Sequence, residues 1–208
     1  MEREPIGASH AASAAAASVV RRATVSDEPT VVDALLLAFA ADPVMRWIWP
    51  HPQQYVSAWP RMVRTYGGQA FLHESAHCLD GYLGAALWLP PGVHPDPDPV
   101  MALLQETVSE ARQPDLLAFF EQMGRFTPEA PYWYLPIIGV DPSHQEQGHG
   151  SALLRYGLRS ADRDTLPAYL EASNTRNVAL YERHGFEVIG TIQAVGSPTA
   201  YAMYRRAR

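Results

Sequence analysis

Apolar and polar positions along the chain change period several times, which predicts alternating strands and helices. Residues 18–25 have the short apolar pattern of a strand, and an apolar repeat with helical spacing begins at Val31. The polar residues 26–28 supply helix-capping groups between the two. Residues 43–66 are rich in aromatic side chains and interrupted by prolines, which predicts short helices around a cavity.

A hairpin is predicted in the next part of the chain. Residues 71–79 and 82–90 are apolar runs joined by Asp80-Gly81, a dipeptide typical of tight turns between antiparallel strands. The later pattern predicts helices at 100–111 and 114–124, a strand at 132–140, a helix at 151–162, a strand at 167–172, a helix at 174–184, and strands near 186–194 and 199–205.

Composition narrows the class of protein. The chain has 208 residues, 47% of them hydrophobic, and a formal net charge of −6. This length predicts one domain over residues 18–208. Residues 1–17 are small and polar without the pattern of a signal peptide, which predicts a disordered leader. The negative charge argues against nucleic acid or a membrane as partner. Cys78 is the sole cysteine, which favours a cytoplasmic location, and all 16 basic residues are arginine, which excludes a Schiff-base lysine.

The segment most suggestive of chemistry joins the predicted strand 132–140 to the helix that begins at Ser151. Gly148 and Gly150 lie in the connecting loop. The first N–H groups of a helix have no partner within it, and the helix dipole adds positive charge there. Because glycine allows the backbone to approach an anion closely, the loop predicts a binding site for a pyrophosphate.

This loop and a second segment carry a resemblance to a known family. Ile138, Val140, Asp141-Pro142, Gln145, Gly148 and Gly150 resemble motif A of the GCN5-related N-acetyltransferases. Downstream, LEASNTRNVALYERHGFEVIG is similar to that family's closing segment, with Asn174, Asn177, Tyr181, Gly185 and Phe186 at motif positions. The resemblance covers about residues 19–205 and is dense from 131 onward. It is closest to the puromycin N-acetyltransferase-like branch.

The resemblance implies a fold, a co-substrate and a reaction. The fold is α/β (α+β): a mixed, mostly antiparallel seven-stranded sheet with splayed central parallel strands, flanked by helices. The reaction is direct acetyl transfer from acetyl-CoA to a primary amine, and the expected acceptor is a small molecule such as an aminonucleoside or an antibiotic-like amine. The resemblance implies no metal, and the expected protein is a monomer or homodimer. The coenzyme residues implied are Ile138, Gly139, Val140, Gln145, Gln147, Gly148, His149, Gly150, Ser151, Asn174, Asn177 and Tyr181.

The same resemblance suggests roles in catalysis. Tyr181 stands where the family places a phenol near the coenzyme sulfur, so it is the expected general acid, and Glu171 is the first choice for the general base. Pro136 inside the strand predicts a bulge that leaves a backbone N–H near Ile138 free for the thioester oxygen. The expected substrate contacts, for which core packing is the alternative, are Trp47, Tyr132 and Tyr134, with Trp49 and Trp59 as further aromatic candidates.

One residue of the loop departs from the family pattern. Glu146 stands where the family usually has Gly or Arg. A carboxylate directed at a pyrophosphate would repel it, so Glu146 is expected to point to solvent.

Two alternative functions compete with this interpretation. His73-Glu74-Ser75-Ala76-His77 matches the zinc-peptidase pattern HExxH, which requires a helix. The predicted strand would separate the two histidines by about 13 Å, too far to share one ion. The second alternative is a catalytically silent coenzyme-A-binding regulatory module; the presence of both Tyr181 and the glycine loop favours catalysis over it.

Overall fold

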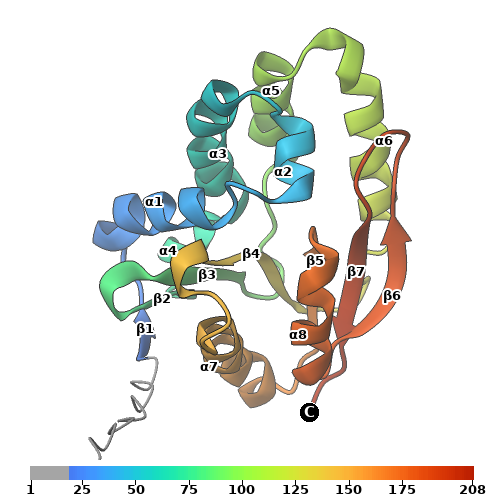
Figure 1. The fold of residues 1–208 in the computed structure, drawn as a ribbon. Helices are drawn as coiled ribbons and strands as arrows, with labels where there is room; N and C mark the ends of the chain where they lie inside the picture. Colours follow the sequence, from blue (N-terminus) through green and yellow to red (C-terminus); the bar gives the residue numbers. More distant parts are fainter. Residues whose placement is uncertain (1–18) are drawn as a thin grey trace, which may run out of the picture.

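Seven strands form one sheet in the order β1-β2-β3-β4-β5-β7-β6 in the computed structural model, which describes residues 19–208 (Figure 1). The predicted leader at 1–17 lies outside the described residues. The strands are β1 (Val20–Arg22), β2 (Ala76–Leu79), β3 (Gly84–Leu89), β4 (Trp133–Val140), β5 (Ala168–Ala172), β6 (Glu187–Ile192) and β7 (Ala200–Arg205). Of the strand pairs, β4 and β5 are parallel and all others are antiparallel. The predicted fold class is therefore confirmed.

Helices cover both faces of this sheet. The α-helices are α1 (Glu28–Ala38), α2 (Pro43–Ile48), α3 (Pro52–Gly67), α4 (Gln69–Leu72), α5 (Pro97–Thr107), α6 (Gln113–Gly124), α7 (His149–Arg163) and α8 (Val178–Arg183). In Figure 1, α1 to α3 lie above the sheet and α7 lies below it. Two hydrophobic cores result, a larger one under α1 to α6 and a smaller one under α7 and α8.

The helix α7 packs closely on the sheet because its sequence allows it. Its buried residues include Leu153, Leu154 and Leu158, which share one face of the helix at the expected spacing. At Gly157 an added Cβ would lie 2.0 Å from the indole nitrogen of Trp88 on β3. A side chain at this position would therefore push the helix away from the sheet, and with it the loop that precedes the helix.

Three predicted elements differ from the structure. The helix predicted from Ser151 begins at His149, so Gly150 lies in its first turn and not in the loop. The run 71–79 is not one strand, because Phe71 is buried in the short helix α4 and β2 begins only at Ala76. The segment 43–66 contains the short helix α2, but its second helix, α3, is 16 residues long and continues through Pro60. Tyr55, Trp59, Met62 and Val63 are buried on one side of α3, and packing of that apolar face outweighs the proline.

Candidate active site

Strand β4 changes its pairing in the middle, which opens the sheet. Against β3, Leu87 pairs with Ile137 but Leu89 pairs with Tyr134, so β4 has one extra residue at Leu135-Pro136. Against β5, pairing is limited to Trp133 and Tyr134. The bulge predicted at Pro136 is thus present, since proline has no N–H to give to the ladder. Beyond it the parallel strands separate.

The separation exposes one edge of β4. The N–H of Asp141 donates to the carbonyl of Leu83 on the β3 side. Backbone groups alternate along a strand, so the N–H groups of Ile138 and Val140 point to the opposite edge, where β5 has diverged. This edge is the place where an extended ligand can pair with β4 and where a backbone donor can reach an oxygen of the ligand.

The loop after β4 ends at an open helix N-terminus. Gly148 is the N-cap of α7 with φ of 85°, a left-handed conformation that favours glycine, and it has no side chain to cap the helix. Space is not the constraint, because a Cβ at Gly148 would meet nothing within 4 Å. At Gly150, in the first turn of α7, a Cβ would lie 3.3 Å from Leu180, so the glycine lets this turn lie close to α8. No side chain of Gly148 caps the N-terminus of α7, which makes the first turn of this helix the candidate anion site.

Side chains of the loop mostly hold the loop itself. The amide Nε2 of Gln145 donates to the carbonyl of Val140 at 3.0 Å, which ties the loop back to the strand. The hydroxyl of Ser151 lies 2.7 Å from Nε2 of His184 and accepts a hydrogen bond from Arg155. The rings of His149 and His144 are neighbours, 6.5 Å apart, and Gln147 is exposed. The loop thus offers mainly backbone donors to an anion.

Glu146 is exposed, as predicted, and has an unusual backbone conformation. Its φ is 62°, in the left-handed region that is unfavourable for a residue with a side chain. The family's frequent glycine at this position would adopt the same conformation without strain.

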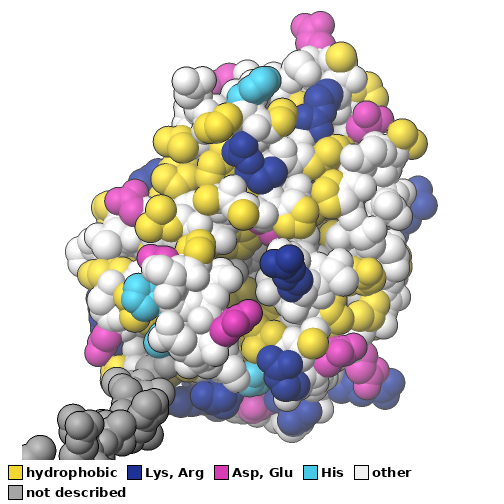
Figure 2. All heavy atoms as spheres, viewed as in Figure 1, with side chains coloured by type: hydrophobic (Ala, Val, Ile, Leu, Met, Phe, Trp, Pro, Cys, Tyr) yellow, Lys and Arg dark blue, Asp and Glu magenta, His cyan; other side chains and the backbone are white. Residues whose placement is uncertain are grey.

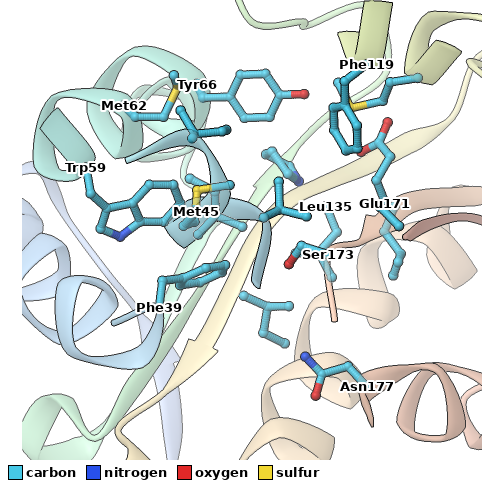
Figure 3. Close-up of a pocket in the computed structure, with 18 of the residues that line it drawn as sticks. Phe39, Met45, Trp59, Met62, Tyr66, Phe119, Leu135, Glu171, Ser173 and Asn177 are labelled. Carbon is cyan, nitrogen blue, oxygen red and sulfur yellow. The ribbon is translucent and has the colours of Figure 1, made fainter. Parts of the chain in front are cut away.

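A cavity lies where β4 and β5 diverge, and it extends under the helices α2, α3 and α6. Figure 3 shows Phe39, Met45, Trp59 and Met62 on one side and Leu135, Glu171 and Ser173 on the other, with Phe119 and Tyr66 near one end and Asn177 at the opposite end. In Figure 2 the surface is hollowed near its centre, and apolar side chains gather on the helical part above the hollow. The cavity connects the open edge of β4 to a mostly apolar chamber.

Glu171 is the carboxylate in the cavity wall. It lies on β5, and its Oε2 accepts a hydrogen bond of 2.7 Å from the hydroxyl of Tyr134, which in turn lies 2.7 Å from the hydroxyl of Tyr66. Burial raises the pKa of Glu171 to about 7, against the lowering effect of hydrogen bonds such as that from Tyr134. A carboxylate with this pKa can both accept and release a proton near neutral pH.

A second buried carboxylate, Asp42, was not predicted from the sequence. Its Oδ1 accepts hydrogen bonds from the N–H groups of Val44 and Met45 at the start of α2, and its Oδ2 accepts one of 2.6 Å from the hydroxyl of Ser173. Burial raises its pKa, although these hydrogen bonds favour the charged form. Asp42 joins α2 to the chain just after β5, and so holds two walls of the cavity together.

The closing segment brings Tyr181 and Asn177 to the cavity and keeps Asn174 away from it. Tyr181 is 5% exposed, lines the cavity, and its hydroxyl makes no hydrogen bond with another residue among 19–208. Burial, and secondarily the charge of Asp42, raises the pKa of Tyr181, so its phenol stays protonated. Asn177 also lines the cavity. Asn174 instead caps a short 3₁₀ helix, since its Oδ1 accepts from the N–H of Arg176.

The aromatic residues proposed for substrate binding divide into two groups. Trp49 and Trp59 line the cavity. Trp47 is placed behind the wall, where its ring packs 5.6 Å from that of Phe119. Tyr132 and Tyr134 do lie side by side, with ring centroids 6.3 Å apart, but both are buried beneath the wall. Tyr134 contributes to the cavity through its hydroxyl, which donates a hydrogen bond to Glu171 in the cavity wall.

The HExxH segment does not form the helix that a zinc peptidase requires. His73 and Glu74 follow the end of α4, with φ of 55° at Glu74, and His77 lies on β2. Glu74 forms an ion pair of 2.6 Å with Arg22, and the ring of His77 packs 4.7 Å from that of Tyr156. The prediction of one strand through both histidines is wrong, because a turn separates them. Since they are not on one helix, the two histidines also lack the shared helical face that a zinc peptidase needs.

Residues 19–208 include no helix that is both long and apolar enough to cross a membrane.

Comparison with known proteins connects this geometry to a family. The family model described as an acetyltransferase (GNAT) domain matches residues 109–188, which include β4, the glycine loop, α7, β5 and Tyr181. The mycothiol acetyltransferase of Propionibacterium freudenreichii subsp. shermanii is 40% identical over 58 residues, which are 26% of this chain and 19% of that protein. The match therefore spans about a fifth of the length of this curated relative.

Solved structures share the whole fold. A structure described as histone acetyltransferase HPA2 and related acetyltransferase, from Corynebacterium glutamicum, is 27% identical, with a TM-score of 0.66 over 92% of this chain and 97% of that chain. PaiA N-acetyltransferase from Thermoplasma acidophilum, solved with coenzyme A, is 12% identical, with a TM-score of 0.53 over 92% and 99% of the two chains. Residues 109–188 therefore match an acetyltransferase (GNAT) domain, and the chain as a whole has the fold of these acetyltransferase structures.

Proposed function

We propose that the chain transfers the acetyl group of acetyl-CoA to the primary amine of a small molecule. One observation carries the proposal: a single cavity joins the open edge of β4 to a carboxylate, Glu171, whose pKa is about 7. Coenzyme and acceptor can therefore meet with a proton acceptor beside them. The resemblance to the puromycin N-acetyltransferase-like branch supports an aminonucleoside or another antibiotic-like amine as the acceptor.

In this proposal the coenzyme binds along β4 and the glycine loop. The pyrophosphate lies at the N-terminus of α7, where the N-cap Gly148 has no side chain to cap the helix. The pantetheine arm pairs with the open edge of β4 at Ile138 to Val140. Gln145 supports the loop from behind, and Gly139 lets α1 pack against β4, since a Cβ there would lie 2.6 Å from that of Ala38.

The chemistry uses three groups around the cavity. Glu171 takes a proton from the substrate ammonium, so that the amine nitrogen attacks the thioester carbonyl carbon. A backbone N–H at the open edge of β4 stabilises the negative charge that develops on the carbonyl oxygen. The carbon–sulfur bond then breaks as the nitrogen releases its second proton to solvent, and Tyr181 gives a hydrogen bond or its proton to the departing thiolate.

The experiment compares the wild type with Tyr181→Phe. Thiol release from acetyl-CoA is followed across a panel of primary amines, and coenzyme binding is measured by calorimetry. We expect turnover by the wild type, and in the variant a loss of about 10²-fold in kcat with little change in coenzyme affinity. Normal coenzyme binding without turnover on any amine would identify a silent coenzyme-A-binding module instead.

A further inference from the structure

The chamber that faces Glu171 is unusually apolar. In Figure 3, Trp59 and Met62 from α3 and Met45 from α2 form one wall, and Phe119 from α6 stands across from them. The remaining apolar side chains of the lining include Phe39, Val44, Ile48, Trp49, Phe120 and Met123. Aromatic rings and methionines bind flat apolar groups well, because the rings stack and the thioethers adapt to their shape.

The charged groups of the cavity are very few. Glu171 is the one carboxylate among the described residues that line it, and no arginine or histidine belongs to this lining. Asp42 stands nearby, but its two oxygens already accept hydrogen bonds from Val44, Met45 and Ser173. Among the described residues of this lining, a ligand therefore finds a charged partner for one ammonium group and no charged partner for a carboxylate or a phosphate.

Two arginines close in sequence to lining residues, Arg46 on α2 and Arg112 just before α6, are engaged elsewhere. Arg46 donates to the carbonyl of Pro50 at 2.7 Å and lies 5.4 Å from the ring of Tyr55. Arg112 donates to the carbonyl of Trp47 and lies over its ring. Both guanidinium groups hold the helical wall together from outside the cavity lining.

We propose that the acceptor is a hydrophobic monoamine: one primary ammonium group on a short linker to an aromatic or similarly bulky apolar group. The inference rests on the proposed function and names the substrate class of that same site. The ammonium lies at Glu171, close to the open edge of β4, and the apolar group occupies the chamber between α3 and α6. A polyamine would bury a second cation without a partner, and a free amino acid would bury its carboxylate without one.

The experiment measures kcat/KM with acetyl-CoA for four matched amines. 2-Phenylethylamine is the probe of the proposed class, and propylamine lacks its ring. Phenylalanine adds a carboxylate, and spermidine adds cations. We expect 2-phenylethylamine to exceed propylamine about 30-fold, the effect of burying a phenyl ring, and to exceed phenylalanine and spermidine by about 100-fold or more.

The outcomes separate the inference from the proposed function. Acetylation of spermidine or phenylalanine at least as efficient as that of 2-phenylethylamine would overturn the hydrophobic monoamine and leave N-acetylation intact. Equal rates for propylamine and 2-phenylethylamine would also overturn it. No thiol release with any of the four amines, while coenzyme binds, would instead count against the proposed function.

A variant that fills the chamber tests the location of the apolar group. Met45→Trp adds volume on the α2 wall, and we expect it to lower kcat/KM for 2-phenylethylamine about tenfold more than kcat/KM for propylamine. Val56→Trp, at a position on α3 that is 56% exposed, is the control and should change neither value. Equal losses for both amines in Met45→Trp, in a variant with unchanged melting temperature, would place the apolar group elsewhere and overturn the inference.

Discussion

The coenzyme half and the acceptor half of the candidate site are built in opposite ways. The coenzyme half is one continuous segment, β4, the glycine loop and α7, and it offers backbone groups. The acceptor half is assembled from α1 to α3, α6, β4 and β5, and it offers side chains. A site made of backbone groups depends on backbone conformation, so substitutions of glycines and of residues with strained φ should affect it most. A site made of side chains depends on burial, so substitutions that change the pKa of a buried group or the packing around it should affect it most.

The largest expected effect is on the acceptor half. Glu171→Gln should lower kcat/KM about 10²-fold or more, because the amide cannot accept the ammonium proton. In the wild type, kcat/KM should rise with pH through about 7, as Glu171 loses its proton, and the variant should lack this step. Glu187→Gln, at an exposed position of β6, is the control with unchanged activity. Full activity of Glu171→Gln would mean that a different base serves the reaction.

The same substitution should stabilise the fold. The pKa of Glu171 is raised from 4.5 to about 7 in the folded protein, so between these pH values the unfolded chain ionises first and stability falls as pH rises. Above pH 7 the charged carboxylate lowers the free energy of unfolding by about 2 kcal/mol, a value reduced for the access of solvent to the open cavity. Denaturant unfolding at pH 8 should therefore show Glu171→Gln to be more stable than the wild type, while at pH 4 the two should agree. A variant less stable than the wild type at pH 8 would show that the carboxylate stabilises the fold.

The two halves also differ in what the sequence predicts. The coenzyme half is local, so a strand pattern, Pro136 and the glycines at 148 and 150 were enough to predict the bulge and a helix N-terminus, although the helix begins at His149 and not at Ser151. The acceptor half depends on contacts between distant residues. The hydrogen bond from Ser173 to Asp42 spans 131 positions, and in the sequence Asp42 before a proline is simply a helix cap. Trp47 and Trp49 are two residues apart, and only three-dimensional packing determines that Trp49 lines the cavity.

A conformational change in the coenzyme half should have a smaller effect. Gly148→Ala places a Cβ at a φ of 85°, which costs about 1–2 kcal/mol or shifts the loop, so coenzyme affinity should fall about fivefold to tenfold. Gly92→Ala is a matched control, because Gly92 has φ of 82° and also has open space around its Cβ. Both variants should lose similar stability in thermal unfolding, and only Gly148→Ala should bind coenzyme A more weakly in calorimetry. Equal coenzyme affinity in the wild type, Gly148→Ala and Gly92→Ala would show that the glycine loop does not bind the pyrophosphate.

The smallest expected effect is a gain, and it comes from Glu146. Removing its exposed charge in Glu146→Gln should strengthen coenzyme binding about twofold at low salt, with less effect at high salt because exposed charges are screened. Glu146→Gly should give the same gain and also add about 1 kcal/mol of stability by relieving the left-handed backbone. Thr165→Gly, with φ of 53° at the other end of α7, should add similar stability without any change in affinity. If Glu146→Gln and Glu146→Gly bind coenzyme A no better than the wild type, the carboxylate does not oppose the pyrophosphate, and the family's preference for glycine here reflects backbone conformation alone.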